Sequence, residues 1–340
     1  MPSRPGPRLL VTGATGFLGR HLVSRLQGLG FETRCLVRES SSSSPIDALG
    51  AEIYRGDLSD LEFLRQSLEN RDILIHCAAL VSDWATVKEI EEANVLLTKR
   101  LLQAAKACGI KKFVHISTTD VYGHPGSPSV NESTPLPTSF SNWYAETKRD
   151  AEQLVQASPL DYCILRPATI FGPYSTAMLG EIAKALCFGK MLMLNQGRSI
   201  AGLTFVDHVV DAILLIMENP KAKNQVFNIS DESPVCWRQF LTDLSHGLGC
   251  PLNVIQLPLP LAKIAGFGLE VSYRQLRSVF GIKSRPLLSR QAVQILSIDQ
   301  SFSSQKIKSE LGWAPAKTYE MGLKETIDWA LPFVQGCRSQ

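Results

Sequence analysis

Short apolar runs alternate with longer amphipathic segments along the first half of the chain. The first run, Leu9–Val11, is followed by apolar residues at positions 17, 18, 22, 23 and 26, a spacing typical of one face of a helix. Further apolar runs lie at 31–37, 52–55, 72–77, 112–116 and 162–166, and long helical patterns at 87–107 and 143–155. Strands that alternate with helices form parallel βαβ units. We therefore expect an α/β protein with a doubly wound parallel sheet.

The second half of the chain predicts a smaller C-terminal α/β domain. A helix is expected at 176–188, and short strands at 204–206 and 226–229. We expect residues 1–173, with 202–230 returning to them, to form a nucleotide-binding domain, and residues 174–201 and 231–335 to form a substrate-binding lid domain. Prolines and glycines interrupt the apolar segment 257–271, so we expect a short helix from about Leu261 with one apolar face, not one long core helix.

Three glycines at three-residue spacing, Gly13, Gly16 and Gly19, join the first strand to the first helix. In a strand–turn–helix unit, such glycines permit a tight turn, a close approach of the backbone to a pyrophosphate, and close packing of helix on strand. The free N–H groups of the helix N-terminus favour an anion. A tight turn without a ligand is the alternative, but the flanking strand and helix favour a dinucleotide. The expected contacts from this turn are Gly13, Thr15, Gly16, Phe17, Leu18 and Gly19.

The end of the second strand predicts which dinucleotide is bound. Arg38 stands there, followed by Glu39 and a run of serines. A guanidinium pairs with a 2′-phosphate, whereas a carboxylate accepts from a ribose hydroxyl, so Arg38 favours NADP over NAD. Arg34 is a rival for the same role.

Residues after the third and fourth strands also belong to the expected cofactor site. Asp57, followed by Leu58, either accepts from the adenine amino group or caps the helix that starts near Ser59. The small side chains of Ala78 and Ala79 leave room for a flat cofactor at a strand end, although ordinary tight packing explains them equally well.

Polar residues at the end of the fifth strand and on the following helix form a candidate catalytic set. Tyr144 and Lys148 are four residues apart and share one helix face, and Thr118 follows the fifth strand. We expect the Lys148 ammonium to lower the pKa of Tyr144, so that the phenol works as acid or base, while Thr118 holds the substrate oxygen. Asn94 lies within the long helix, either as a buried amide with partners or as a surface residue.

The chain resembles the extended short-chain dehydrogenases/reductases, which form the NAD(P)-dependent epimerase/dehydratase superfamily and have a Rossmann-type domain. The resemblance implies that Thr118, Tyr144 and Lys148 are the catalytic triad, that Asn94 supports it, and that Pro167 and Ile170 lie beside the nicotinamide. The matching motifs are Thr12–Gly19, Gly56–Leu58, His76–Ala79, Asn94, Ser117–Gly123, Tyr144–Lys148, Leu165–Pro173, Phe205–Val209 and Tyr319–Trp329.

Two departures from the superfamily pattern bear on the substrate. Thr169 stands where sugar-nucleotide enzymes of the superfamily carry Asn, and Thr119–Asp120 stand where dehydratases carry Asp–Glu. The apolar segment 258–271 and the run 286–290 instead resemble the 3β-hydroxysteroid dehydrogenase-like branch, which includes reductases of bulky β-keto acids. This resemblance implies an NAD(P)-dependent oxidoreductase that interconverts a secondary alcohol and a ketone on a bulky apolar substrate.

Two other functions remain open. A nucleotide-sugar epimerase would need a diphosphate clamp, for which Arg274, Arg277 and Arg285 are candidates. A non-catalytic NAD(P)-sensing scaffold would have no use for an intact set of Thr118, Tyr144 and Lys148.

Composition excludes several classes. With 35 Lys and Arg against 32 Asp and Glu, the net charge of +3 does not indicate a nucleic-acid partner. Eight cysteines without a CxxC pair predict reduced thiols in a cytoplasmic setting, and no metal site is predicted. No signal peptide or transmembrane run is evident. We expect a cytoplasmic protein, with peripheral membrane contact through 257–271 or a homodimer contact left open.

Overall fold

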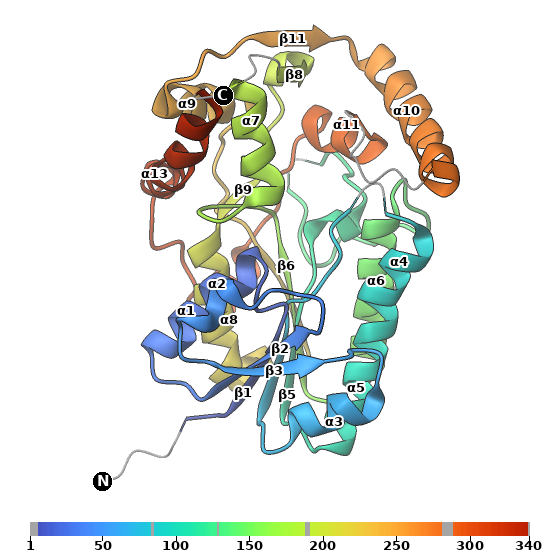
Figure 1. Cartoon of the computed structure of the whole chain (residues 1–340), viewed down its shortest axis with the longest axis vertical. Coiled ribbons are helices and arrows are strands. Elements are labelled where there is room, and N and C mark those ends of the chain that lie inside the picture. Colours follow the sequence, from blue (N-terminus) through green and yellow to red (C-terminus); the bar gives the residue numbers. More distant parts are fainter. Residues whose placement is uncertain (1–5, 83–84, 128, 188–190, 281–287, 339–340) are drawn as a thin grey trace.

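A seven-stranded parallel sheet organises the computed structural model, which describes residues 6–82, 85–127, 129–187, 191–280 and 288–338 (Figure 1). The strand order is β10-β6-β5-β4-β1-β2-β3, and the recorded pairings are all parallel. This order confirms the doubly wound α/β fold. The strands are β1 (Leu9–Thr12), β2 (Thr33–Arg38), β3 (Glu52–Gly56), β4 (Ile73–His76), β5 (Lys112–Ile116), β6 (Tyr162–Pro167) and β10 (Gln225–Ile229).

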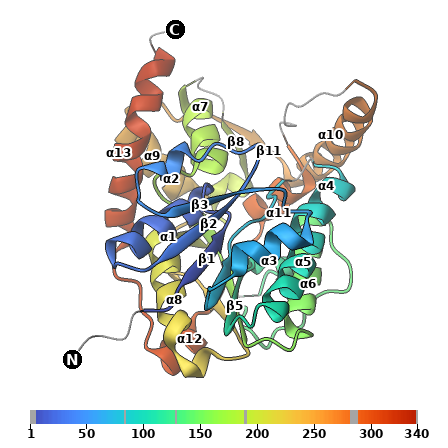
Figure 2. The ribbon, with the colours of Figure 1, turned by 60° about the horizontal axis from the view of Figure 1, so that its bottom comes forward.

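Helices cover both faces of this sheet because its strands are apolar on both sides. In β1, Leu9 and Val11 pack into one core with α1 (Phe17–Gly28) and α8 (Val206–Glu218). Leu10 points to the other core, with α3 (Leu61–Leu68) and α5 (Leu97–Ala107). Figure 2 shows α1 and α8 on one side of the sheet and α3, α5 and α6 (Trp143–Gln156) on the other.

Most of the C-terminal elements gather beyond one end of the sheet (Figure 1), whereas α8 and α12 lie against the sheet itself (Figure 2). Two small parallel sheets pair β11 with β8 and β7 with β9. The remaining elements are α2 (Ser44–Asp47), α4 (Val87–Glu91), β7 (Thr169–Phe171), α7 (Glu181–Cys187), β8 (Met191–Leu194), β9 (Leu203–Phe205), α9 (Trp237–Leu248), β11 (Val254–Leu257), α10 (Leu259–Phe280), α11 (Arg290–Ser297), α12 (Gln305–Leu311) and α13 (Tyr319–Arg338). The domain boundaries proposed from the sequence remain an interpretation.

Two predicted helices are π-helical in part. The helix expected at 87–107 consists of α4, the π-helical segment η1 (Glu92–Leu96) and α5, and the helix expected at 176–188 begins with the π-helical segment η3 (Thr176–Gly180) before α7. Single π-helical turns often occur at functional sites. In η1 the extra residue places Asn94 on the inner side of the helix, where it is buried.

The expectation of a short helix in the segment 257–271 is wrong. One helix, α10, runs for 22 residues from Leu259 to Phe280. Pro260 does not interrupt it because proline is tolerated in the first turn, where N–H groups lack helical acceptors anyway. Among the described residues, no helix is long and apolar enough to cross a membrane.

Candidate active site

The glycine turn between β1 and α1 is closely packed against the end of β4. Gly13 has a φ of +70°, and a Cβ there would lie 2.6 Å from the backbone nitrogen of Ala78. A Cβ on Gly19 would lie 2.1 Å from the carbonyl oxygen of Gly13. Both positions therefore require glycine for reasons of backbone packing.

Gly16 differs, because its side of the turn is open. A Cβ there would meet only the Gly13 oxygen, at 3.2 Å, among the described residues. Gly16 is the N-cap of α1 and offers no side chain to the first N–H groups of the helix. An exposed turn with uncapped amides fits an anionic pyrophosphate at this place. The geometry thus agrees with the dinucleotide site expected around Thr15, Phe17 and Leu18.

The end of β2 separates the two arginines proposed for cofactor selection. Arg34 points elsewhere, because its guanidinium pairs with Glu52 at 2.9 Å and donates to the carbonyl oxygen of Ser67 at 2.8 Å. Arg38 is exposed at the strand end. Arg34 is therefore not a rival, and Arg38 remains the candidate.

Arg55 of β3 is a residue that the sequence interpretation missed. Its guanidinium donates to the carbonyl oxygens of Arg38, Glu39 and Ser41 and, at 2.7 Å, to the hydroxyl of Ser43. Arg55 thus orders the loop that follows Arg38. No signal in the sequence marks it, because its place beside Val37 depends on the register of β2 on β3.

Asp57 is exposed and does not cap the next helix. It accepts from the backbone N–H and the hydroxyl of Ser59, each at 2.8 Å, and these hydrogen bonds hold the pKa of its carboxyl below the usual value. The N-cap of α3 is Asp60. The capping alternative for Asp57 is therefore wrong, and its role toward a cofactor remains a proposal, as do those of Leu58 and Ala79.

Asn94 is buried and fastens the segment after β4 to helix α6. Its Oδ1 accepts from the N–H of Leu80 at 2.8 Å, and its Nδ2 donates to the carbonyl oxygen of Leu80 and, at 3.1 Å, to the hydroxyl of Thr147. The surface alternative for Asn94 is wrong. Its contacts reach Thr147, between the candidate residues Tyr144 and Lys148.

Thr118 and Tyr144 come together at the end of β5. Tyr144 is 8% exposed and Thr118 is 9% exposed. Burial and the Asp120 carboxylate raise the pKa of Tyr144 above that of a free phenol, while a side-chain hydrogen bond from Thr118 opposes the rise. We expected Lys148 to lower the pKa of Tyr144, but in this structure Lys148 is not among the groups that shift it. The buried phenol therefore keeps its proton at neutral pH, as a proton donor must.

Lys148 points to the sheet, not to the phenol. Its Nζ donates to the carbonyl oxygen of Ile116 at 2.6 Å and lies 3.4 Å from His115 Nε2. Burial lowers the pKa of Lys148 to about 8, against the opposing effect of Glu152. Burial also holds the pKa of His115 well below its usual range. A buried ammonium beside a neutral imidazole is positioned to bind a hydroxyl group placed at this end of the sheet.

The residues proposed to lie beside the nicotinamide belong to strands β6 and β7. Pro167 is buried at the end of β6, and Ile170 is partly buried in β7. Arg166, next to Pro167, makes a bidentate pair with Glu152 at 2.9 and 2.6 Å, both side chains being almost fully buried. This pair fixes β6 against α6 and so positions the proposed nicotinamide side.

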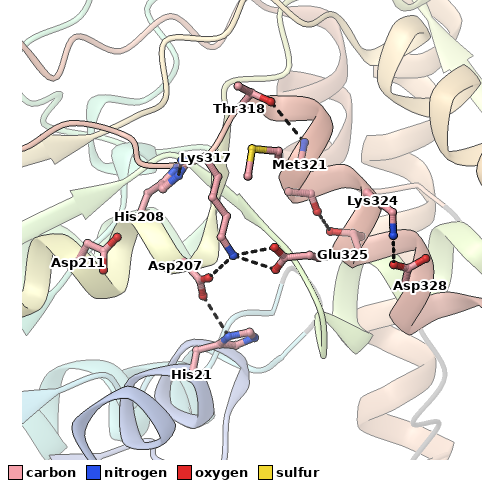
Figure 3. Close-up of polar contacts among 12 residues, drawn as sticks. His21, Asp207, His208, Asp211, Lys317, Thr318, Met321, Lys324, Glu325 and Asp328 are labelled. Carbon is pink, nitrogen blue, oxygen red and sulfur yellow. Dashed lines mark hydrogen bonds and ion pairs between the residues drawn. The ribbon is translucent and has the colours of Figure 1, made fainter. Parts of the chain in front are cut away.

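A second polar cluster joins the helix after the glycine turn to the C-terminal helix (Figure 3). Lys317 Nζ donates to Asp207 of α8 at 2.8 Å and to Glu325 of α13 at 2.7 Å. His21 of α1 contacts Asp207 at 3.5 Å. The hydrogen bond with His21, followed by that of Lys317, holds the pKa of Asp207 well below its usual range.

The alternative diphosphate clamp falls mostly outside the described part of the chain. Arg285 lies outside the described residues, as do Pro286, Leu287 and the side chains of Arg274 and Arg277. Arg290, the last residue of the run 286–290, is bound to the buried Glu270 at 2.9 Å.

Comparisons with known proteins identify similar chains along the whole length. The family described as "NAD dependent epimerase/dehydratase family" matches residues 9–230. A "4-hydroxy-2-methyl-3-oxo-4-farnesyl-3,4-dihydroquinoline-1-oxide ketoreductase" of Stigmatella aurantiaca is 34% identical over 97% of this chain and 98% of its own. A "3beta-hydroxysteroid-dehydrogenase/decarboxylase isoform 1" of Arabidopsis thaliana is 28% identical over 94% of this chain and 78% of its own.

A solved structure shows the same fold. DesIV, a dTDP-glucose 4,6-dehydratase of Streptomyces venezuelae with NAD and TYD bound, matches with a TM-score of 0.76 over 95% of this chain and 96% of that one. At 23% sequence identity, this likeness concerns the fold alone.

Proposed function

Because the chain belongs to the NAD-dependent epimerase/dehydratase family, we propose that it interconverts a ketone and a secondary alcohol on a bulky, largely apolar substrate. Its membership and its named reductase and dehydrogenase relatives make it an NAD(P)-dependent oxidoreductase of the extended short-chain dehydrogenase/reductase type. The substrate class, the roles of individual residues and the choice between NADP and NAD are the proposal.

The observation that carries the proposal is the pair of hydroxyls of Thr118 and Tyr144 at the end of β5, with the phenol buried and protonated. The nicotinamide of the bound dinucleotide supplies or accepts the hydride. Tyr144 donates its proton to the substrate oxygen in reduction and takes it back in oxidation, while Thr118 holds the same oxygen. Lys148 binds the ribose of the cofactor, and Asn94 keeps α6 in place.

Two further observations favour an apolar substrate. Relatives along the full length act, by their names, on a farnesylated quinoline oxide and on 3β-hydroxysteroids. The Thr119–Asp120 pair also departs from the Asp–Glu pair of sugar-nucleotide dehydratases. Sterols and β-keto acids with long alkyl chains belong to the proposed class.

Helix α10 presents an apolar stripe to solvent. Leu261 is 55% exposed, Ile264 70%, Phe267 55% and Val271 41%, and their spacing of three to four residues places them on one side of the helix. The opposite side carries the buried Ala262 and packs on α11. The stripe lies on the side of the helix away from Ala262, and Phe267 in its middle also contacts Arg290 at the start of α11.

The surface of a lipid bilayer is the proposed occupant of this stripe. Lys263 is exposed beside it, and Glu270 is buried and bonded to Arg290, so the described part of α10 presents a basic charge and no exposed acidic one. An apolar face with flanking lysine is typical of helices that lie in the interface of anionic membranes. Such contact would bring the active site to a substrate dissolved in the bilayer.

A turnover screen tests the proposed function. The purified protein is incubated with NADPH or NADH and with a keto-steroid, a 2-alkyl-3-keto acid or a uridine or thymidine diphosphate sugar. We expect reduction of an apolar ketone, with NADPH preferred. Conversion of a nucleotide sugar would indicate the epimerase alternative. Binding of NADPH without turnover of any substrate would favour the sensing scaffold.

A further inference from the structure

The buried imidazole of His124 faces the carboxylate of Asp120, close to the hydroxyls of Thr118 and Tyr144. Thr118 precedes the short 3-10 helix η2 (Thr119–Tyr122), and its Oγ1 accepts from the N–H of Asp120 at 3.2 Å. One turn later, His124 has a φ of +56°, and its side chain is 1% exposed. Non-glycine residues keep such a conformation only where their surroundings enforce it, and they gather at functional sites.

The hydrogen bonds of His124 determine which of its nitrogens carries a proton. Gln300 Nε2 donates to the carbonyl oxygen of Ile298 at 2.9 Å, so Gln300 Oε1 is the atom that faces His124 Nδ1 at 2.7 Å. Because a carbonyl oxygen only accepts, Nδ1 must donate. In a neutral imidazole, Nε2 is then a bare acceptor.

This bare acceptor would face another acceptor. His124 Nε2 is buried, has no hydrogen-bond partner in the described part of the chain, and lies 3.7 Å from Asp120 Oδ1. Two acceptors at this separation, away from water, repel each other unless one of them carries a proton. A proton on Nε2 turns the repulsion into an ion pair.

Asp120 connects this pair with the C-terminal helices. Its Oδ2 accepts from Gln291 Nε2 of α11 at 3.0 Å. On the other side, the Asp120 carboxylate acts on Tyr144 and raises the pKa of the phenol. Within the described residues, Tyr144 is the one other titratable group that interacts with Asp120 or His124. The remaining partners of the two residues, Gln291, Gln300 and Thr118, are neutral.

We propose that His124 carries a second ring proton, on Nε2, and forms an ion pair with Asp120, and that this ion pair, held by Gln291 and Gln300, sets the charge that faces Tyr144. The two residues are positioning residues, since they act through the phenol and do not touch the substrate. The part of this inference that concerns turnover rests on the proposed function. The protonation of His124 does not.

Alcohol oxidation gives the kinetic test. At pH 8 the oxidation rate follows the fraction of phenolate at Tyr144, which changes tenfold for each unit of its pKa. Asp120→Asn removes the carboxylate and, with it, the proton on His124 Nε2, so the two changes in charge oppose each other at Tyr144 and the oxidation rate should change little while KM stays unchanged. His124→Asn leaves Asp120 uncompensated, so the rate should fall. In the double variant the effect of His124→Asn should disappear.

Matched variants separate this effect from general damage. His246→Asn alters an exposed histidine and should leave the oxidation rate at the parental value. Gln294 lies on α11 but contacts Ser141 instead of Asp120. Gln294→Leu should therefore have less effect than Gln291→Leu. A fall of the oxidation rate in Asp120→Asn, or an unchanged rate in His124→Asn, would overturn the inference.

Nitrogen-15 spectra of the histidine side chains test the pair without substrate or cofactor. The chain has only six histidines, and the signal missing in His124→Asn assigns the residue. At pH 7 we expect both ring nitrogens of His124 to be protonated, and only Nδ1 to be protonated in Asp120→Asn. An Nδ1-only signal in the parent protein would refute the ion pair even if turnover were never found. The expected spectra without turnover would instead count against the proposed function alone.

Discussion

Replacement of Phe267 by Asp tests whether the stripe of α10 lies on a membrane. Phe267 is 55% exposed, so the substitution removes little internal packing. Its ring lies under the Arg290 guanidinium at 5.6 Å, and loss of this contact costs about 0.5–1 kcal/mol. We expect the variant to fold, with a circular dichroism spectrum like that of the parent.

The structure also gives the expected loss of membrane affinity. A phenylalanine side chain can bury roughly 200 Å². With 55% of it open to solvent, about 110 Å² remains to be covered by lipid. At about 25 cal/mol per Å², this area is worth about 2.8 kcal/mol, or a factor of about 100 in partitioning. The introduced carboxylate adds repulsion from anionic lipid.

Sedimentation with vesicles of phosphatidylcholine and phosphatidylserine measures the partitioning. Leu29→Asp is the matched control, because Leu29 is 57% exposed in the turn after α1, far from α10 (Figure 2). The control should sediment like the parent protein, whereas Phe267→Asp should remain in the supernatant. Equal sedimentation of the two variants would refute the lipid assignment. A parental dimer in gel filtration that Phe267→Asp converts to monomer would instead assign the stripe to a second copy of the chain.

Three other substitutions test the site and its support. Tyr144→Phe should lower kcat for ketone reduction by ~10²–10⁴-fold and leave the Kd of NADPH little changed, because only the hydroxyl is lost; parental turnover would show that another group is the acid. Arg38→Ala should weaken NADPH binding by roughly 10- to 100-fold and spare NADH, as measured by fluorescence titration, and equal losses would contradict the 2′-phosphate assignment. Lys317→Met should lower the free energy of unfolding by about 1–2 kcal/mol in urea titrations, because it leaves Asp207 with one partner fewer. Because the pKa of Asp207 is lowered in the folded state, its carboxylate stabilises the fold at pH values above the ordinary aspartate pKa of ~3.9. This stabilisation is lost as the pH falls below that value, so the difference in stability between the parent and Lys317→Met should shrink there.

The strands of the large sheet were predictable because each is an apolar run bounded by polar turns. Each of the seven lies within about two residues of an apolar run in the sequence. The glycine turn was predictable for the same local reason, because Gly13, Gly16 and Gly19 recur at three-residue spacing between an apolar run and an amphipathic segment. Patterns of this kind depend on neighbouring residues alone.

Features that depend on tertiary contacts were not predictable. Glycines and prolines in 257–271 predicted a break, yet α10 is continuous, because burial of Ala262 and Glu270 on the side facing α11 outweighs weak helix propensity. The π-helical turn at Asn94 follows from its bonds to Leu80 and Thr147, which come from other parts of the chain. The pKa of Tyr144 also depends on the burial of its ring and on the direction in which the Lys148 side chain points. The four-residue spacing between Tyr144 and Lys148 in the sequence predicts neither of these.

The two polar clusters connect the C-terminal helices to different parts of the proposed reaction. Lys317 and Glu325 reach Asp207 and, through His21, the helix that follows the glycine turn. Gln291 of α11 reaches Asp120, which acts on the phenol. If both assignments hold, loosening α13 alters the affinity for the dinucleotide, whereas loosening α11 alters the proton transfer at Tyr144. Substitutions in these helices should therefore separate into those that change cofactor Kd and those that change the pH dependence of kcat.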